Sequence, residues 1–193
     1  VASLSLKTSG AAYLTQARSL ALADSKVGGL TLTVSGTLDA QNLVAKGSVS
    51  MAATELGLGH LVAEGQSVSL DLTGSVAGKD TGTDIHAGTL NIRASAVGSS
   101  DDPLQIAVDG LSLNLGSGGA SIEELDGLGV VGSGIVSAGS VRITTQQGDL
   151  QLKAPVTLSG SASLTLSAPA GAIGQEPGST VSTEKGDVQI KGL

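Results

Sequence analysis

The 193-residue chain contains no cysteine, no phenylalanine and no tryptophan, and Tyr13 is its only aromatic residue. Without cysteine, neither disulfide bonds nor thiolate metal sites contribute to the fold. A globular core normally takes much of its buried area from aromatic side chains. Their scarcity therefore favours a narrow interior that is filled by Leu, Val, Ile and Ala.

Positive charge is scarce as well, because 10 Lys and Arg stand against 17 Asp and Glu and the net charge is −7. This balance argues against a nucleic-acid partner, since phosphate backbones demand clusters of Lys and Arg. It also argues against electrostatic attachment to anionic lipid. No apolar run approaches the length of a membrane span, and no charged-then-apolar leader opens the chain. We therefore expect no membrane insertion.

Proline occurs only 4 times, and the 29 glycines follow no Gly-X-Y period, which excludes a collagen helix. The chain is 40% hydrophobic with a mean hydropathy of +0.28, which is too apolar for a disordered chain. No linker-like change of composition divides it, so we expect one domain over residues 1–193. Because the strand pattern is under way at Ser3 and neither end carries a polar cap, we expect this domain to be a segment of a longer protein.

The most informative feature that is present is a four-residue pattern of a small or polar, an aliphatic, a polar and an aliphatic residue. Such alternation is typical of a strand with one buried face. The pattern occupies residues 3–6, 29–32, 48–51, 67–70, 89–92, 110–113, 140–143, 163–166 and 187–190. The intervals between successive starting positions are 26, 19, 19, 22, 21, 30, 23 and 24.

A return every twenty-odd positions is the period of a solenoid, in which each coil buries its inner face against its neighbours. The two 19-residue coils each hold three short apolar runs that are separated by corners. We predict an all-β fold, a parallel β-helix (β-solenoid) with about 19–24 residues and three short strands per coil. A right-handed coil follows from the usual twist of strands. Leu30, Val49 and Val68 are expected to lie directly above one another.

Longer coils are interpreted as 19-residue coils with loops inserted at corners. Candidate loops are residues 79–86 and 99–103, and a third lies within residues 116–134. The 30-residue interval that holds the third loop could instead hide a whole extra, degenerate coil. The 26-residue opening interval contains Ser19-Leu20-Ala21-Leu22, which could be a strand in its own right.

Several segments of the second half carry a family resemblance. They are Ser99-Ser100-Asp101-Asp102-Pro103-Leu104, Leu111-Ser112-Leu113-Asn114, Thr-Gln-Gln-Gly-Asp-Leu-Gln-Leu at 145–152 and Ala-Pro-Ala-Gly-Ala-Ile-Gly at 168–174. With this repeat length and no Cys, the chain resembles the shaft of filamentous-haemagglutinin-like exoproteins of two-partner secretion in Gram-negative bacteria. The resemblance implies a large secreted adhesin at the bacterial cell surface. Nothing matches that family's N-terminal secretion domain, so an outer-membrane transporter is implied as a partner only for the parent protein.

Two groups of acidic residues invite a test for metal binding. The first is Asp80, Asp84 and His86, and the second is Glu123, Glu124 and Asp126. Calcium loops place oxygen ligands at alternating positions with a Gly turn, which the segment 80–84 does not do. We expect residues 79–86 to be a solvated polar loop. His60 and His86 are far apart in the sequence without His or Cys nearby to complete a zinc set, so we expect two exposed corner residues and no metal or cofactor site.

Parallel β-helices include polysaccharide lyases and hydrolases, so the outward face must be tested for catalysis. Such sites need several carboxylates with Arg or Lys on one face, and sugars stack there on aromatic rings. The outward residues at corresponding positions are neutral except Arg142: Ser5, Thr31, Ser50, Ser69, Asn91, Ser112, Arg142, Thr165 and Gln189. Asp71 and Arg93 are expected to meet on adjacent coils as a structural ion pair. We predict no catalytic residues.

The sequence therefore predicts a shaft segment of a large secreted adhesin, which mediates attachment, aggregation or cross-linking of a biofilm matrix. One alternative is an extracellular polysaccharide-binding module that grips a glycan by residues 79–86 or by the polar face. A second alternative is an enzyme of the polysaccharide-lyase type, for which Asp71 and Arg93 would be the residues to test.

Overall fold

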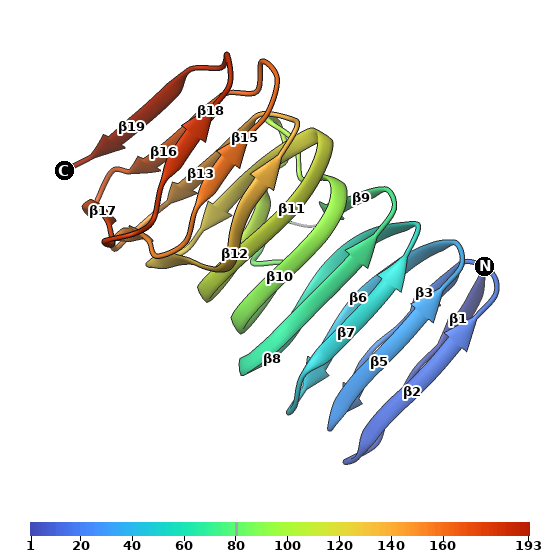
Figure 1. The fold of residues 1–193 in the computed structure, drawn as a ribbon. Helices are drawn as coiled ribbons and strands as arrows, with labels where there is room; N and C mark the ends of the chain where they lie inside the picture. Colours follow the sequence, from blue (N-terminus) through green and yellow to red (C-terminus); the bar gives the residue numbers. More distant parts are fainter. Residues whose placement is uncertain (80) are drawn as a thin grey trace.

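The computed structural model describes residues 1–79 and 81–193, and in these residues the chain consists of strands and turns without a helix. Strands make up 67% of the chain and wind into a β-solenoid of about nine turns (Figure 1). Neighbouring strands pair in parallel from one end of the stack to the other, as in Leu20↔Leu38 and Leu164↔Val188. The predicted parallel β-helix is confirmed.

Each coil has three sides, which we call faces A, B and C. Face A holds β1 (Ala2–Leu4), β3 (Leu20–Leu22), β9 (Ser75–Gly78), β13 (Val141–Thr145), β16 (Leu164–Ala168) and β19 (Val188–Gly192). Face B holds β4 (Ser25–Val27), which pairs with the second half of β6 (Thr37–Ala45). Face C holds β2 (Ala11–Gln16), β5 (Gly29–Val34), β7 (Val49–Ala53), β12 (Leu128–Ser137), β14 (Leu150–Leu152), β15 (Val156–Leu158), β17 (Ile173–Gln175) and β18 (Val181–Thr183).

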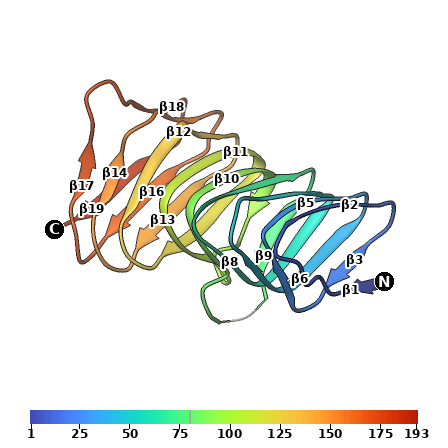
Figure 2. The same cartoon turned by 90° about the horizontal axis from the view of Figure 1, so that it is seen from below.

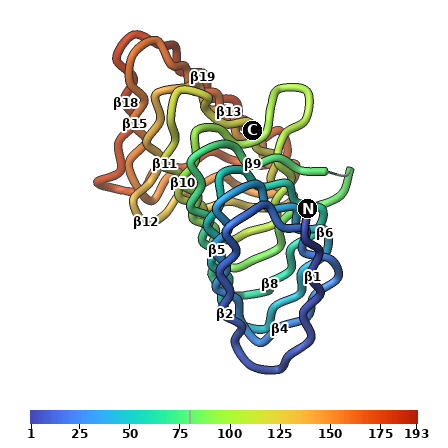
Figure 3. Tube along the Cα trace, turned by 90° about the vertical axis from the view of Figure 1, so that its right-hand side faces the viewer, coloured from blue at the N-terminus to red at the C-terminus, as the bar shows by residue number. Residues whose placement is uncertain are grey.

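The middle coils differ from the prediction of short strands, because their chain turns corners without leaving the ladder. The long strands are β6, β8 (Glu55–Leu72), β10 (Ile85–Val97) and β11 (Leu104–Glu124). β11, for example, pairs with the coil before it on all three faces through Ile85↔Ile106, Leu90↔Leu111 and Val97↔Ala120. Figure 3, in which the coils are seen as closed loops, shows these corners.

The alternation in the sequence explains which side chains form the core. In β5 the side chains of Leu30, Leu32 and Val34 are buried, whereas Thr31 and Thr33 are exposed. One core of Leu, Val, Ile, Ala and Met51 runs along the whole stack. Each fully buried aliphatic side chain stabilises the fold by about 1.5–3 kcal/mol, and only stacked neighbours can bury it.

The predicted vertical alignment of the first coils is confirmed, because Leu30 pairs with Val49 and Val49 with Val68. The 26-residue opening interval is also explained. Ala12 pairs with Leu30 on face C, and the segment that contains Leu20 forms β3 on face A. The opening interval therefore contains a further strand on face C, β2, and one coil runs from Ala12 to Leu30.

The nine copies of the pattern do not all lie on one face, which corrects the assumption that each marks the same point of a coil. Leu90 and Leu111 continue the row on face C, whereas Val141, Leu164 and Val188 form a row on face A. The 30-residue interval is therefore neither one long coil nor two complete ones. From Leu111 on face C the chain passes through face A, returns to face C in β12 and then reaches Val141 on face A. The four-residue pattern therefore reappears on a different face.

The third predicted insertion does lie within residues 116–134, but it interrupts a strand rather than a corner. β11 continues to Glu124, a short turn follows, and β12 begins at Leu128. The extra residues form a bulge within β12, since Leu111 pairs with Val130 but Leu113 pairs with Ile135. Beyond this bulge, face C is divided between β14 and β15 in one coil and between β17 and β18 in the next.

Candidate functional site

Face C presents a polar outer surface whose order is set by the ladder. Successive coils place Thr31, Ser50, Ser69, Asn91 and Ser112 in one row. A second row, two positions further along each strand, contains Thr33, Ala52, Asp71, Arg93 and Asn114. Because adjacent strands lie about 4.8 Å apart, the first row offers one polar group per coil at nearly constant spacing, whereas Ala52 interrupts the second row.

A shallow groove of about 290 Å³ crosses these rows between Ser50 and Ser133. Arg93 Nη1 lies 3.2 Å from Asp71 Oδ1 in the groove, and both side chains are more than 60% exposed. The predicted ion pair on adjacent coils is therefore confirmed. Ser133 belongs to the bulge of β12, and its hydroxyl lies 2.7 Å from that of Ser112. The groove offers hydroxyl, amide, carboxylate and guanidinium groups for hydrogen bonding.

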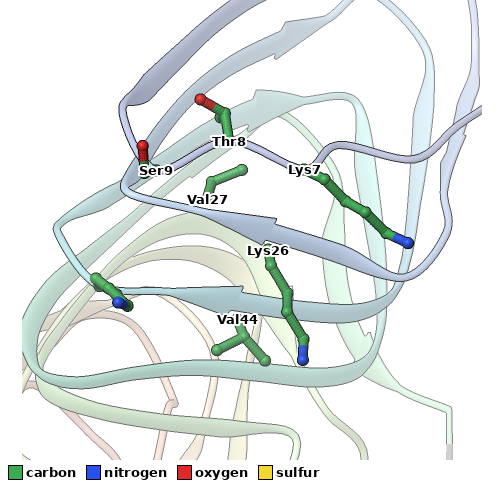
Figure 4. A pocket seen from close by; sticks show the side chains of 7 residues that line it. Lys7, Thr8, Ser9, Lys26, Val27 and Val44 are labelled. Atoms are coloured by element: carbon green, nitrogen blue, oxygen red, sulfur yellow. The ribbon is translucent and has the colours of Figure 1, made fainter.

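A second hollow, of about 380 Å³, lies at the first coils and is basic (Figure 4). Lys7, Lys26 and Lys46 line it together with Thr8, Ser9, Val27 and Val44. This group of lysines was not predicted from the sequence. The signal was nevertheless present, since the three lysines recur at intervals of one coil, at positions 7, 26 and 46.

Residues 79–86 are not a solvated loop throughout, which corrects the prediction. The side chain of Asp84 is buried, with 1% of the residue exposed. Its backbone N–H donates to the Gln105 carbonyl, and its Oδ2 accepts the Gln105 N–H, both at 2.8 Å. Asp84 is therefore part of the ladder between coils, and Ile85 already belongs to the core. Asp80 lies outside the described residues.

Further contacts tie this corner to neighbouring coils. His60 is exposed, as predicted, and its Nδ1–H donates to the Thr83 carbonyl at 2.8 Å. His86 is also exposed but lies within β10 rather than at a corner. Lys79 Nζ lies 2.6 Å from Asp39 Oδ2. The Lys79 side chain crosses Gly57 to reach it, and a Cβ at Gly57 would collide with this stem.

Figure 2 shows the stack from below with the two termini at opposite ends, and along it the chain passes from β9 on face A to β10 on face B. The predicted loop at 99–103 occupies the same corner in the next coil, since both connections lead from face A to face B. In that loop the Asp102 N–H donates to Ser99 Oγ at 3.0 Å. Asp101 and Asp102 are exposed.

The second acidic group contains a carboxyl whose position the sequence analysis did not foresee. Glu124 is completely buried, whereas Asp126 is exposed. The Val108 N–H donates to both carboxyl oxygens of Glu124 at 3.2 Å, and the Leu125 N–H donates to Oε1 at 3.1 Å. Glu124 thus satisfies backbone donors at the point where the strands of face B end.

Burial, together with a hydrogen bond to the Asp126 side chain, raises the pKa of Glu124 from 4.5 to about 8. The N–H groups of Val108 and Asp126 oppose this shift, because they favour the charged form. The burial of Glu124 could have been predicted from the alternation, because Ala120, Ile122 and Glu124 occupy alternate positions on the same side of β11.

Within residues 1–79 and 81–193, no three His, Asp or Glu side chains are arranged to hold a metal ion. The same residues contain no helix that is long and apolar enough to cross a membrane. No protein-family model, no curated protein and no solved structure matches this chain.

Proposed function

We propose that the chain is a structural shaft segment of a large secreted bacterial surface adhesin. In this role it would mediate attachment, aggregation or cross-linking of a biofilm matrix, and the parent protein would reach the surface through an outer-membrane transporter. The observation that carries the proposal is the unbroken parallel ladder, in which each inner coil pairs with the coils on both sides. A stack of this kind extends in one direction and holds whatever it carries at a fixed distance.

The core supports a mechanical role. Aliphatic side chains from successive coils form one continuous cluster along the stack, so no internal boundary separates weakly joined parts. The corner contacts also resist separation of the coils. Lys79 reaches across the coil that contains Gly57 and binds Asp39, which lies two coils earlier. A shaft needs this resistance to local separation more than it needs a binding pocket.

The shape can be tested by duplicating residues 30–67, which make two 19-residue turns that begin on face C. We expect small-angle X-ray scattering to show a particle about 10 Å longer with an unchanged cross-section, because each coil adds about 4.8 Å. A Gly/Ser insert of equal length at the same site is the control and should give no ordered extension. An enlarged cross-section without added length would contradict the shaft.

Surface location needs its own measurement. Antibodies raised against the chain should label the outside of intact source cells in immunogold electron microscopy. Label confined to the interior of those cells would overturn the adhesin proposal, whatever the shape of the particle.

A second candidate function is an extracellular polysaccharide-binding module, favoured by the groove on face C. We expect Asn91→Ala combined with Asn114→Ala to weaken any glycan found on an array by about 10-fold, since each lost hydrogen bond contributes about 0.5–1.5 kcal/mol. Thr157→Ala with Ser182→Ala, outward on the same face beyond the groove, is the matched control. Equal weakening in both variants would exclude the groove. Deleting residues 79–86 would not test glycan binding by that segment, because the deletion also removes the buried Ile85 and Asp84.

A lyase-type enzyme remains the weakest of the three interpretations. A β-helical enzyme that cleaves polysaccharide needs several carboxylates with Arg or Lys on one face, and hydrolysis in particular uses two carboxyl groups that flank the scissile bond. The described residues that line the groove include one carboxylate, Asp71, and one guanidinium, Arg93, which bind each other. The proposed shaft is accordingly non-catalytic.

A further inference from the structure

The basic hollow at the first coils combines three lysines that the fold brings together. Lys7 and Lys26 pair directly across adjacent coils through an isolated parallel bridge. The Lys46 N–H donates to the carbonyl of Val27, the residue next to Lys26, at 3.1 Å. The ladder therefore fixes the three backbones on successive coils, and each coil presents one exposed lysine.

No acidic side chain in the described residues forms an ion pair with these lysines. The ion pairs found there involve Lys79, Arg93 and Lys153 instead. Lys7, Lys26 and Lys46 are all exposed, so their ammonium groups are free to meet a ligand. Figure 4 shows the Lys7 and Lys26 side chains extending from neighbouring strands toward the same side.

The wider charge distribution makes this end of the stack distinct. Residues 1–46 hold four of the 10 basic residues but only two of the 17 acidic ones. The remainder of the chain is strongly acidic and would repel an anionic polymer. An anion that approaches the molecule is therefore directed to the first coils.

The other groups in the hollow suit an anionic sugar. Thr8 Oγ1 accepts the Gly10 N–H at 3.2 Å, which leaves the hydroxyl hydrogen able to donate to an anion. Ser9 adds a second exposed hydroxyl, and Val44 provides a half-buried aliphatic surface for the C–H face of a ring. Hydroxyl donors, an apolar contact and ammonium groups together match a charged saccharide better than a bare ion.

We propose that this hollow binds a linear acidic polysaccharide that carries one carboxylate per sugar residue, such as a polyuronate. One lysine per coil gives one positive charge per strand spacing, and one carboxylate per sugar ring gives a comparable density of negative charge along the polymer. A densely sulfated polymer would place more anions over the hollow than its lysines neutralise. This inference does not depend on the shaft proposal, because it concerns local groups rather than the length of the stack.

The test measures binding of the whole chain to polygalacturonate by calorimetry. At about 0.01 M salt, where the Debye length is ~30 Å, we expect measurable affinity that falls steeply at about 0.15 M. The variant Lys7→Gln/Lys26→Gln/Lys46→Gln should bind roughly 10-fold more weakly or worse, since each surface lysine contributes appreciably to attraction of this kind.

The matched control is Lys153→Gln/Lys185→Gln/Lys191→Gln, which changes the net charge equally but at the other end of the stack. It should bind as the unaltered chain does, and thermal unfolding should show that both variants fold. An equal loss of affinity in both variants would overturn the proposal, as would no binding at low salt. Tight binding of dextran sulfate without binding of polygalacturonate would overturn the carboxylate assignment.

Discussion

Two buried carboxyl groups show how single residues complete a ladder that strands leave unfinished. Asp84 accepts the Gln105 N–H, and Glu124 accepts the N–H groups of Val108 and Leu125. A buried N–H without a partner costs about 1–3 kcal/mol. Each carboxyl therefore stabilises its corner by occupying a position that backbone carbonyls fill elsewhere in the stack.

Glu124 makes the stability of the protein depend on pH. Its pKa is about 8 in the folded state and 4.5 in the ordinary case, so the folded state keeps a proton that the unfolded state releases. The contribution of this group is complete below pH 4.5 and is lost as the pH rises toward 8. We expect Glu124→Gln, which cannot ionise, to flatten the fall of unfolding free energy between pH 5 and 8 by up to about 1.4 kcal/mol per pH unit.

Urea denaturation at several pH values gives this slope directly. Glu123→Gln is the matched control, because the neighbouring side chain is only half-buried and its carboxyl accepts a bond from Gln146 Nε2 at 3.3 Å. The control should keep the slope of the unaltered chain. If Glu124→Gln keeps it too, the buried carboxyl is not the titrating group.

At the scale of elements, the bulge in β12 is the point where the cross-section changes. It shifts the register between Leu111 and Leu113 and divides face C in the coils that follow. Gly134 ends the bulge with a φ of +75° and lies against the Pro155 backbone in the next coil. The close approach requires a residue without a Cβ.

We expect Gly134→Ala to lower the unfolding free energy by more than about 2 kcal/mol, since a left-handed backbone alone costs about 1–2 kcal/mol and the added Cβ would collide with the Pro155 carbonyl. Gly160→Ala is the control, because Gly160 has a φ of +63° and no atom near the position of a Cβ. Denaturant titration of both variants separates backbone strain from collision. Equal losses would show that the contact with Pro155 does not matter.

The strands were predictable from the sequence because inward and outward residues alternate, as Leu30, Thr31 and Leu32 do in β5. The face on which each strand lies was not predictable, since β5 and β13 carry the same pattern on different faces. The lysine group could have been found from its coil-length spacing. The groove could not have been predicted, because the bulge that carries Ser133 forms part of its lining.

At the scale of the whole molecule, the distribution of charge follows the direction of the stack. Basic residues gather in the first coils, and acidic residues dominate the coils that follow. The two proposals depend on different properties of the molecule. The shaft depends on the length of the ladder, and recognition of an acidic polymer depends on the lysines. Either can fail in experiment without affecting the other.

Turns contain more residues at the end of the stack than at its start, with 18 residues from Leu20 to Leu38 and 25 residues from Val156 to Val181. The perimeter therefore differs between the first and the last coils, although neighbouring coils can be equal in length, as the two 19-residue turns from Leu30 to Val68 are. Identical rings could slip past one another during folding or exchange between molecules, whereas graded rings disfavour both errors. The taper thus distinguishes one end of the stack from the other.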